Sequence, residues 1–197
     1  DGCSSLAMKR ALPIILLVVL LVVFSLVGTK LQEVLPGFGP LPAVFFCVAA
    51  CVGLRWLWIP MLAWLLSYPL TNIILGFGWD WQMLVTVGGF SLAVGLGFAL
   101  RKRQRALPLL GGALGAAVLF YLFTNCVSWL LLPDYSKTWS GFVQALWTGA
   151  PHHAVATWVF LRNAALANLL FTGLFLLGQR QWGVEPEREL APVRVRR

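Results

Sequence analysis

The side chain best placed to do chemistry is Arg162, a cation inside an apolar run. Charged groups at membrane depth are rare, and they mark either a functional site or a required pairing. Apolar segments elsewhere in the chain carry amides and hydroxyls at a comparable predicted depth in the outer leaflet. The candidate ligand-binding residues are Arg162, Asn163, Asn125, Thr124, Asn72, Tyr68 and Asn168. A guanidinium among such groups suits a carboxylate or another anion, to which it donates two parallel hydrogen bonds.

Two other interpretations of this polar cluster stay open. The long stem of Arg162 also allows its charge to extend toward the membrane surface and reach water. Alternatively, the amides and hydroxyls form a structural hydrogen-bond cluster, because a polar group inside a membrane needs a protein partner. The sequence predicts the cluster and leaves its role, pocket or packing, undecided.

Other residues that could bind a metal or take part in catalysis give weaker predictions. The adjacent pair His152 and His153 contains a candidate axial ligand to haem or to the magnesium of a pigment, beside its ordinary interpretation as interfacial histidine. The four cysteines include no C-x-x-C pair. The sequence also lacks a close carboxylate pair, a nucleophile elbow, a phosphate-binding glycine loop and an H-E-x-x-H motif. We therefore predict no enzymatic activity, no catalytic residue and no metal site, and we assign no cofactor.

The composition places these residues in a membrane. Of the 197 residues, 59% are hydrophobic and 11% are charged, whereas soluble domains carry about 25% charged residues. Ten tryptophans exclude a disordered chain. The net charge of +8 comes from bases in short clusters between apolar runs, which is typical of membrane topology signals. We predict an integral membrane protein that contacts lipid and binds no nucleic acid.

The fold prediction is an all-α integral membrane protein, a bundle of about six transmembrane helices. A span needs about 20 mostly apolar residues. The candidate spans cover roughly 11–29, 41–54, 56–75, 82–100, 107–132 and 154–178. The second is short, so five spans and a re-entrant segment is the alternative. Basic clusters in alternate loops, the densest at 101–105, favour six spans with both termini in the cytoplasm.

The predicted domain organisation follows from these spans. It consists of a cytoplasmic N-terminal segment over 1–10, a transmembrane helical domain over 11–178 and a basic cytoplasmic tail over 179–197. Residues 133–153 are too polar to span, and the amphipathic stretch 139–147 predicts an outer interfacial half-helix. Glycines cluster in the fourth and fifth spans, which indicates close helix contacts there.

Several stretches of the chain resemble an uncharacterised bacterial family of short membrane proteins. They are residues 123–129, 134–138 with Gly141, 160–163 and 168–172. The resemblance covers about residues 40 to 178. Members of this family are similar to the substrate-binding components of energy-coupling-factor vitamin transporters. The resemblance implies a location in the bacterial inner membrane and a solute-binding role that depends on partner subunits.

Two functions therefore fit the sequence. The first is a solute-binding transporter component whose outward-facing pocket surrounds Arg162, Asn163 and Asn125 and is covered by residues 133–153. The second is an accessory structural subunit of a large respiratory or photosynthetic membrane complex, with tryptophan-rich and phenylalanine-rich faces against partners or pigments. Both functions predict other membrane-protein subunits as partners.

Overall fold

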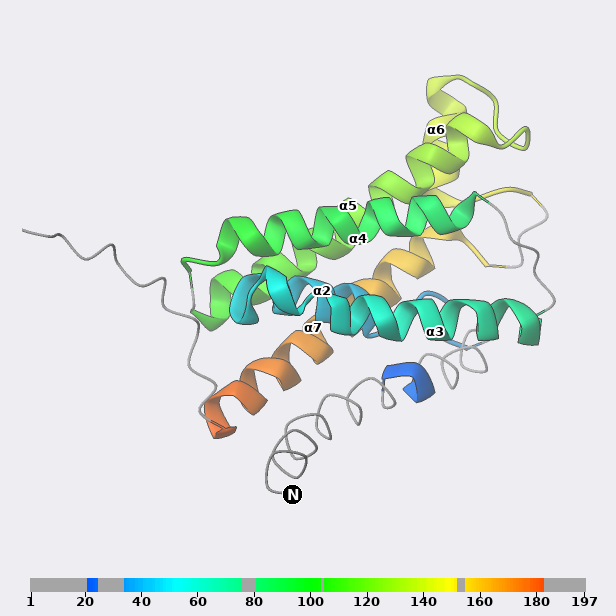
Figure 1. Cartoon of the computed structure of the whole chain (residues 1–197). Coiled ribbons are helices and arrows are strands. Elements are labelled where there is room, and N and C mark those ends of the chain that lie inside the picture. The colour runs from blue at the N-terminus through cyan, green and yellow to red at the C-terminus, as the bar shows by residue number, and fades with distance from the viewer. Residues whose placement is uncertain (1–20, 25–33, 76–80, 104, 152–154, 183–197) are drawn as a thin grey trace, which may run out of the picture.

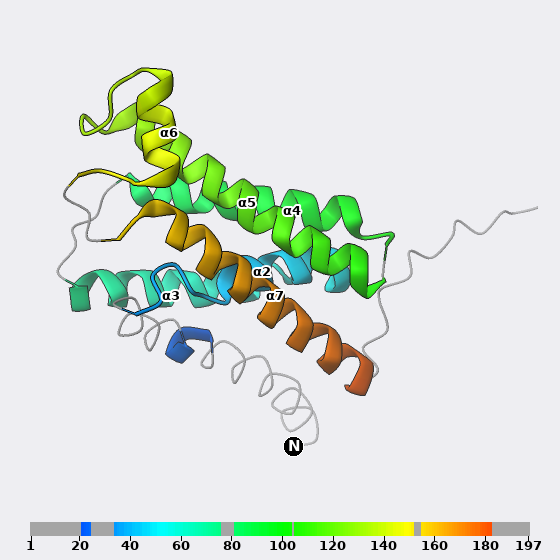
Figure 2. The same cartoon turned by 180° about the vertical axis from the view of Figure 1, so that it is seen from behind.

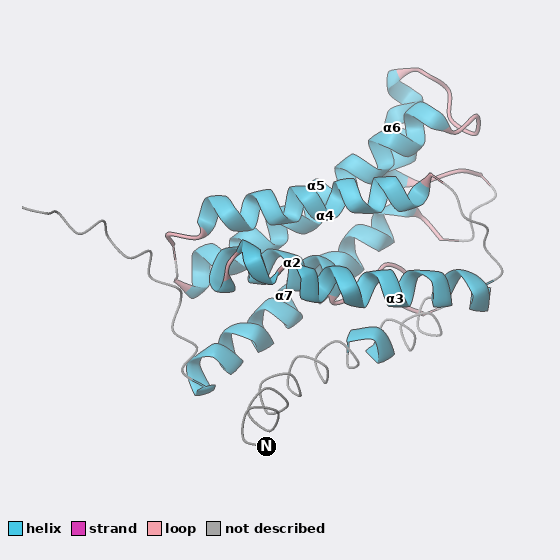
Figure 3. Ribbon diagram, viewed as in Figure 1, coloured by secondary structure: helices cyan, strands magenta, loops and turns pink. Residues whose placement is uncertain are grey.

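The computed structural model describes residues 21–24, 34–75, 81–103, 105–151 and 155–182. This part of the chain contains helices and no strand (Figure 3), which confirms the all-α class. The main helices are α2 (Leu41–Cys47), α3 (Trp58–Leu75), α4 (Gln82–Leu100), α5 (Ala106–Leu131), α6 (Trp139–Trp147) and α7 (Thr157–Trp182).

Three helices in the described part are long and apolar enough to cross a membrane. They are Gln82–Leu100, Ala106–Leu131 and Thr157–Arg180, with mean hydropathies of 2.0, 2.0 and 1.6 over 18 residues. They are compatible with a membrane protein and correspond to the fourth, fifth and sixth predicted spans. The six spans of the prediction are not confirmed, and the first, at 11–29, lies almost wholly outside the described residues.

The second predicted span is a short helix that changes type. After α2 the chain forms a π-helical turn over Val48–Val52, reverses at Gly53 and enters a 3₁₀ turn over Leu54–Trp56 before α3. Gly53 has φ 125°, a backbone conformation that residues with a Cβ atom rarely adopt. The apolar helix Leu41–Val52 therefore extends only about 18 Å at 1.5 Å per residue, less than the roughly 30 Å of a bilayer core.

The core lies where α2 meets α4, α5 and α7. Its buried centre combines large and small side chains, including Phe46, Leu109, Ala93 and Ala113. A Cβ atom added at Gly97 would lie 2.5 Å from the backbone oxygen of Phe46. The absence of a side chain at that glycine allows α2 and α4 to approach closely, as the glycine clusters predict.

One end of the bundle carries the elements that form the candidate site. In Figures 1 and 2, the beginnings of α4 and α7 and the end of α5 lie together near α6, and the basic loop between α4 and α5 lies at the opposite end. The amphipathic stretch 139–147 forms α6 as predicted. The Thr138 hydroxyl caps this helix by accepting a hydrogen bond from the Gly141 amide, 3.2 Å away.

Candidate functional site

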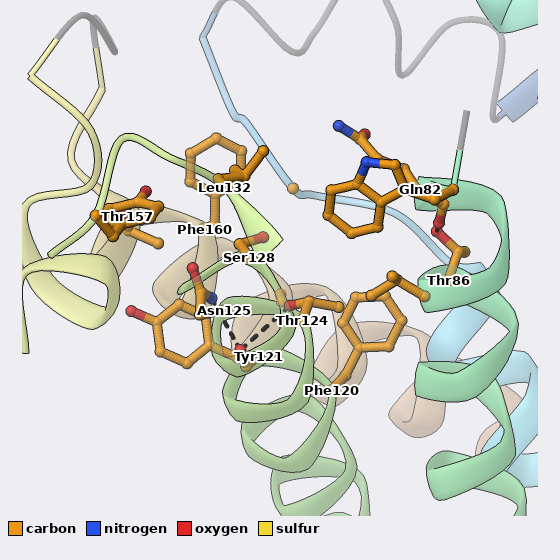
Figure 4. Close-up of a pocket in the computed structure, with 15 residues that line it drawn as sticks. Gln82, Thr86, Phe120, Tyr121, Thr124, Asn125, Ser128, Leu132, Thr157 and Phe160 are labelled. Carbon is orange, nitrogen blue, oxygen red and sulfur yellow. Dashed lines mark hydrogen bonds between the residues drawn. The ribbon is translucent and has the colours of Figure 1, made fainter. Parts of the chain in front are cut away.

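A cavity of about 360 Å³ lies at this end of the bundle. Its walls come from the first turns of α4, the last turns of α5 and the first turns of α7, with contributions from the loops around Gly37 and Tyr135 (Figure 4). Pockets between the helices of a bundle are common positions for ligand sites. The cavity is therefore the candidate functional site.

The face that α5 presents to the cavity follows directly from its sequence. Phe120, Tyr121, Thr124, Asn125 and Ser128 all line the cavity. Residues three or four positions apart share one face of a helix, so this spacing brings an aromatic floor and several polar groups to the same surface. Two of these residues, Thr124 and Asn125, are among the candidates predicted from the sequence.

Hydrogen bonds within the helices fix which polar atoms the cavity offers. Thr124 Oγ1 donates to the Tyr121 carbonyl at 3.2 Å, and Asn125 Nδ2 donates to the same oxygen at 2.8 Å (Figure 4). Thr86 Oγ1 on α4 donates to the Gln82 carbonyl at 2.9 Å. A hydroxyl has one proton and two lone pairs. The threonine protons are thus engaged by backbone oxygens, and their lone pairs stay available for a ligand.

The segment between α5 and α7 packs over one side of the cavity. Tyr121 donates from its hydroxyl to the Leu146 carbonyl and so links α5 to α6. Leu132 and Tyr135 line the cavity, and Tyr135 is buried with Ala145 in a small apolar cluster. The pKa of Tyr135 is raised, chiefly because burial disfavours its charged form, and a hydrogen bond with the Ala150 backbone only partly opposes this shift. Of the predicted cover at 133–153, Tyr135 therefore lies in the cavity lining, and the covering role stays a prediction.

Asn163 lies beside the cavity rather than in its lining. Its side chain is fully buried, and Nδ2 donates to the Pro36 carbonyl at 2.9 Å. Its Oδ1 accepts a hydrogen bond from Arg162 Nε at 3.2 Å. Gly37, the residue after Pro36, lines the cavity. The bond from Asn163 to Pro36 therefore holds one wall of the site in position.

Arg162 is exposed on the outer surface of α7 and does not line the cavity. Its guanidinium carbon lies 5.5 Å from the centre of the Trp158 ring, a cation–π arrangement. Trp158 in turn stacks on Trp147 of α6, with ring centres 6.2 Å apart. The guanidinium therefore packs on an aromatic ring and not in the cavity, and its extension toward the membrane surface stays a prediction.

The three remaining predicted residues lie away from the cavity. Asn168 is buried, and its Nδ2 donates to the Ala113 carbonyl at 3.3 Å. The Asn168 Oδ1 and the Asn72 Nδ2 have no hydrogen-bond partner among the described residues. Tyr68 packs against Trp64, with ring centres 5.3 Å apart. The predicted polar cluster is thus divided among a cavity, a structural hydrogen bond and interior packing.

Sequence reasoning missed several residues of the site. Thr86 and Gln82 on α4, Ser128 on α5 and Thr157 at the start of α7 all line the cavity. A signal for Ser128 was present, since it lies four residues after Thr124 on the same helix face. Thr86 carried no comparable signal, because its place in the site depends on how α4 packs against α5.

Two observations bear on metal and haem binding. Within the described ranges, no group of three or more His, Cys, Asp or Glu residues could hold a metal ion. His152 and His153 lie outside the described residues, so a haem or pigment contact there stays a prediction.

Comparison with known proteins gives one match. The profile of a family of unknown function (DUF6580) matches residues 7–184 of the chain. No curated protein and no solved structure matches the chain. The match agrees with the predicted resemblance to an uncharacterised family, and it shows no link to energy-coupling-factor components.

Proposed function

Since the chain belongs to DUF6580, a family of unknown function, we propose its function from its own cavity: it is a solute-binding component of a bacterial membrane transporter. In this proposal the chain crosses the inner membrane six times, and the cavity opens to the outer side. The observation that carries the proposal is the cavity of about 360 Å³ between α4, α5 and α7.

The form of the cavity supports ligand binding. Small-molecule sites typically enclose about 300–1,000 Å³ and combine apolar walls with a few positioned polar groups. Here Trp81, Phe120 and Phe160 supply aromatic surface, and Thr124 and Asn125 supply polar atoms.

The charge distribution supports an outward-facing cavity. The loop that joins α4 to α5 carries Arg101, Lys102, Arg103 and Arg105 and lies at the end of the bundle opposite the cavity (Figure 2). Basic loops face the cytoplasm in most membrane proteins. Under that rule, the cavity faces away from the cytoplasm.

A role as one component among several subunits agrees with the surface of the bundle. Each of the three long helices exposes large apolar side chains, including Leu84, Leu107 and Leu174. Such surfaces suit lipid and other membrane subunits. The sequence has no phosphate-binding loop of its own, so in this proposal the energy for transport comes from partner proteins, as the resemblance described above implies.

Exposed tryptophans favour a second candidate function, an accessory structural subunit of a respiratory or photosynthetic complex. Trp139 and Trp147 on α6 are 77% and 63% exposed. Large exposed aromatic side chains are common at protein interfaces and at membrane surfaces. The co-purifying proteins distinguish the two candidates.

The experiment that tests the proposal is purification of the full chain in native nanodiscs, followed by mass spectrometry of co-purified small molecules and proteins. Ser128→Phe fills the cavity, and Leu130→Phe on the exposed face of the same helix is its matched control. We expect a solute with the wild type and the control, its loss with Ser128→Phe, and co-migrating ATPase subunits. Co-migrating cytochromes or pigment proteins without a bound solute would instead support the structural role.

A further inference from the structure

We propose that the cavity selects an uncharged, flat aromatic molecule that presents an N–H or O–H donor. The proposal deepens the solute-binding function and rests on it. It differs from the anionic ligand that the sequence predicted, because the guanidinium of Arg162 lies on the outer surface of α7 and not in the cavity lining.

The cavity lacks compensation for a charged ligand. None of the described residues that line it carries a formal charge. Moving an ion from water into an apolar site without an opposite charge is strongly unfavourable. The helix ends offset each other only in part: α4 and α7 begin at the cavity, where an anion is favoured, and α5 ends there, where a cation is favoured. About half an elementary charge is left, which is too little to balance a full ionic charge. An uncharged solute therefore fits best.

The walls suit a flat aromatic ring system. Trp81 lies at the start of α4, Phe120 and Tyr121 on α5, and Phe160 on α7. Figure 4 shows the rings of Phe120, Tyr121 and Phe160 around the open space. Aromatic rings attract one another in offset-stacked and edge-to-face arrangements beyond the simple burial of area. A planar ligand between these three helices makes several such contacts at once.

The polar atoms of the cavity favour a ligand that donates hydrogen bonds. The hydroxyl protons of Thr86 and Thr124 already go to backbone carbonyls. Asn125 uses one of its two N–H groups in the same way, which leaves its Oδ1 as an acceptor and its second N–H as a donor. A ligand donor satisfies these oxygens, whereas an analogue without a donor leaves them buried and unpaired, which costs binding free energy.

The test uses indole derivatives as probes of one ring system. Three compounds of similar size differ in charge: indole-3-ethanol is neutral, tryptamine is a cation and indole-3-acetate is an anion. The second pair consists of isomers of equal mass: 3-methylindole keeps its N–H donor, whereas 1-methylindole carries its methyl group on that nitrogen and has no donor. Binding is measured by equilibrium dialysis against the full chain in nanodiscs, and Ser128→Phe nanodiscs correct for partitioning into lipid.

We expect indole-3-ethanol to bind at least about tenfold more tightly than either charged analogue, and 3-methylindole about tenfold more tightly than 1-methylindole. Thr124→Val removes an acceptor with little change of shape and should reduce the second preference. Thr71→Val, on α3 away from the cavity, is the matched control and should retain it.

Three outcomes would overturn the proposal in different ways. Equal binding of the two methylindoles would contradict the donor requirement. Tighter binding of tryptamine or indole-3-acetate, lost in Ser128→Phe, would contradict the uncharged class and leave the solute-binding function intact. Equal retention of every probe by wild-type and Ser128→Phe nanodiscs would reject the ligand class, while the co-purification experiment separately decides whether the cavity holds another solute.

Discussion

Asn163 and Pro36 are joined by a buried hydrogen bond of 2.9 Å between residues 127 positions apart in the chain. The bond ties the loop that precedes α2 to the second turn of α7. Because Gly37 lines the cavity, the amide of Asn163 supports the site without facing a ligand. Its role is one of positioning, and it suggests a direct test.

Asn163→Ala should lower the free energy of unfolding by about 1–3 kcal/mol, because the Pro36 carbonyl loses its partner in a buried position. The measurement is thermal unfolding of the purified protein in one detergent. Leu166→Ala, on the exposed face of the same helix, is the control and should have a smaller effect. Equal destabilisation by the two variants would contradict the role assigned to Asn163.

Arg162→Lys should leave binding of the co-purified solute within about twofold of wild type, a difference below 1 kcal/mol. The reason is that the guanidinium is exposed over Trp158 and does not line the cavity. Ser128→Phe provides the comparison that should abolish binding. A large loss of affinity in a folded Arg162→Lys protein would restore the anionic pocket that the sequence predicted.

Tyr121→Phe should loosen α6, because the hydroxyl of Tyr121 is what donates to the Leu146 carbonyl. Amide hydrogen exchange measured by mass spectrometry should become faster over 139–147 and stay unchanged over the middle of α4. A single hydrogen bond contributes roughly 0.5–1.5 kcal/mol, so exchange of α6 should accelerate by up to about tenfold. Unchanged exchange in α6 would show that its apolar contacts alone hold it.

Gly97→Ala should destabilise the protein by about 1–3 kcal/mol, since overpacking forces backbone or side chains apart. The added Cβ would lie 2.5 Å from the Phe46 carbonyl oxygen and 3.0 Å from Ala49 Cβ. Gly95→Ala, on the same helix, meets nothing within 4 Å and should be neutral or stabilising, because alanine favours a helix. Thermal unfolding of both variants tests this pair, and similar melting temperatures would refute the close approach of α2 and α4.

The proposed orientation of the bundle in the inner membrane predicts which surface positions react from outside the cell. A cysteine at Ser140 should be modified by a membrane-impermeant maleimide in intact spheroplasts, and a cysteine at Lys102 should react only after lysis. Both positions are exposed, and the unmodified chain gives the background from its native cysteines. Labelling of the cysteine at position 102 in intact spheroplasts would contradict the proposed topology.

The sequence alone determined the class of the protein and much of its local structure. Its apolar composition and low charge predict long apolar helices of the kind that cross a membrane, because a backbone without water must satisfy its own hydrogen bonds. Three described helices are compatible with that prediction. The limits of α6 were predictable from its amphipathic pattern. Thr124 and Asn125 were predictable as site residues, since their helix places them with Tyr121 on one face.

The tertiary structure decided what each remaining polar group does. Successive residues point about 100° apart around a helix, so Arg162 and Asn163 lie on different faces, and only packing against the loop at Pro36 shows that the amide points inward. Thr86 reaches the site because α4 packs beside α5. In the same way, Gly97 faces Phe46 while Gly95 faces open space. Each of these contacts depends on the relative rotation and position of two helices. The spacing of residues along one helix does not specify that geometry.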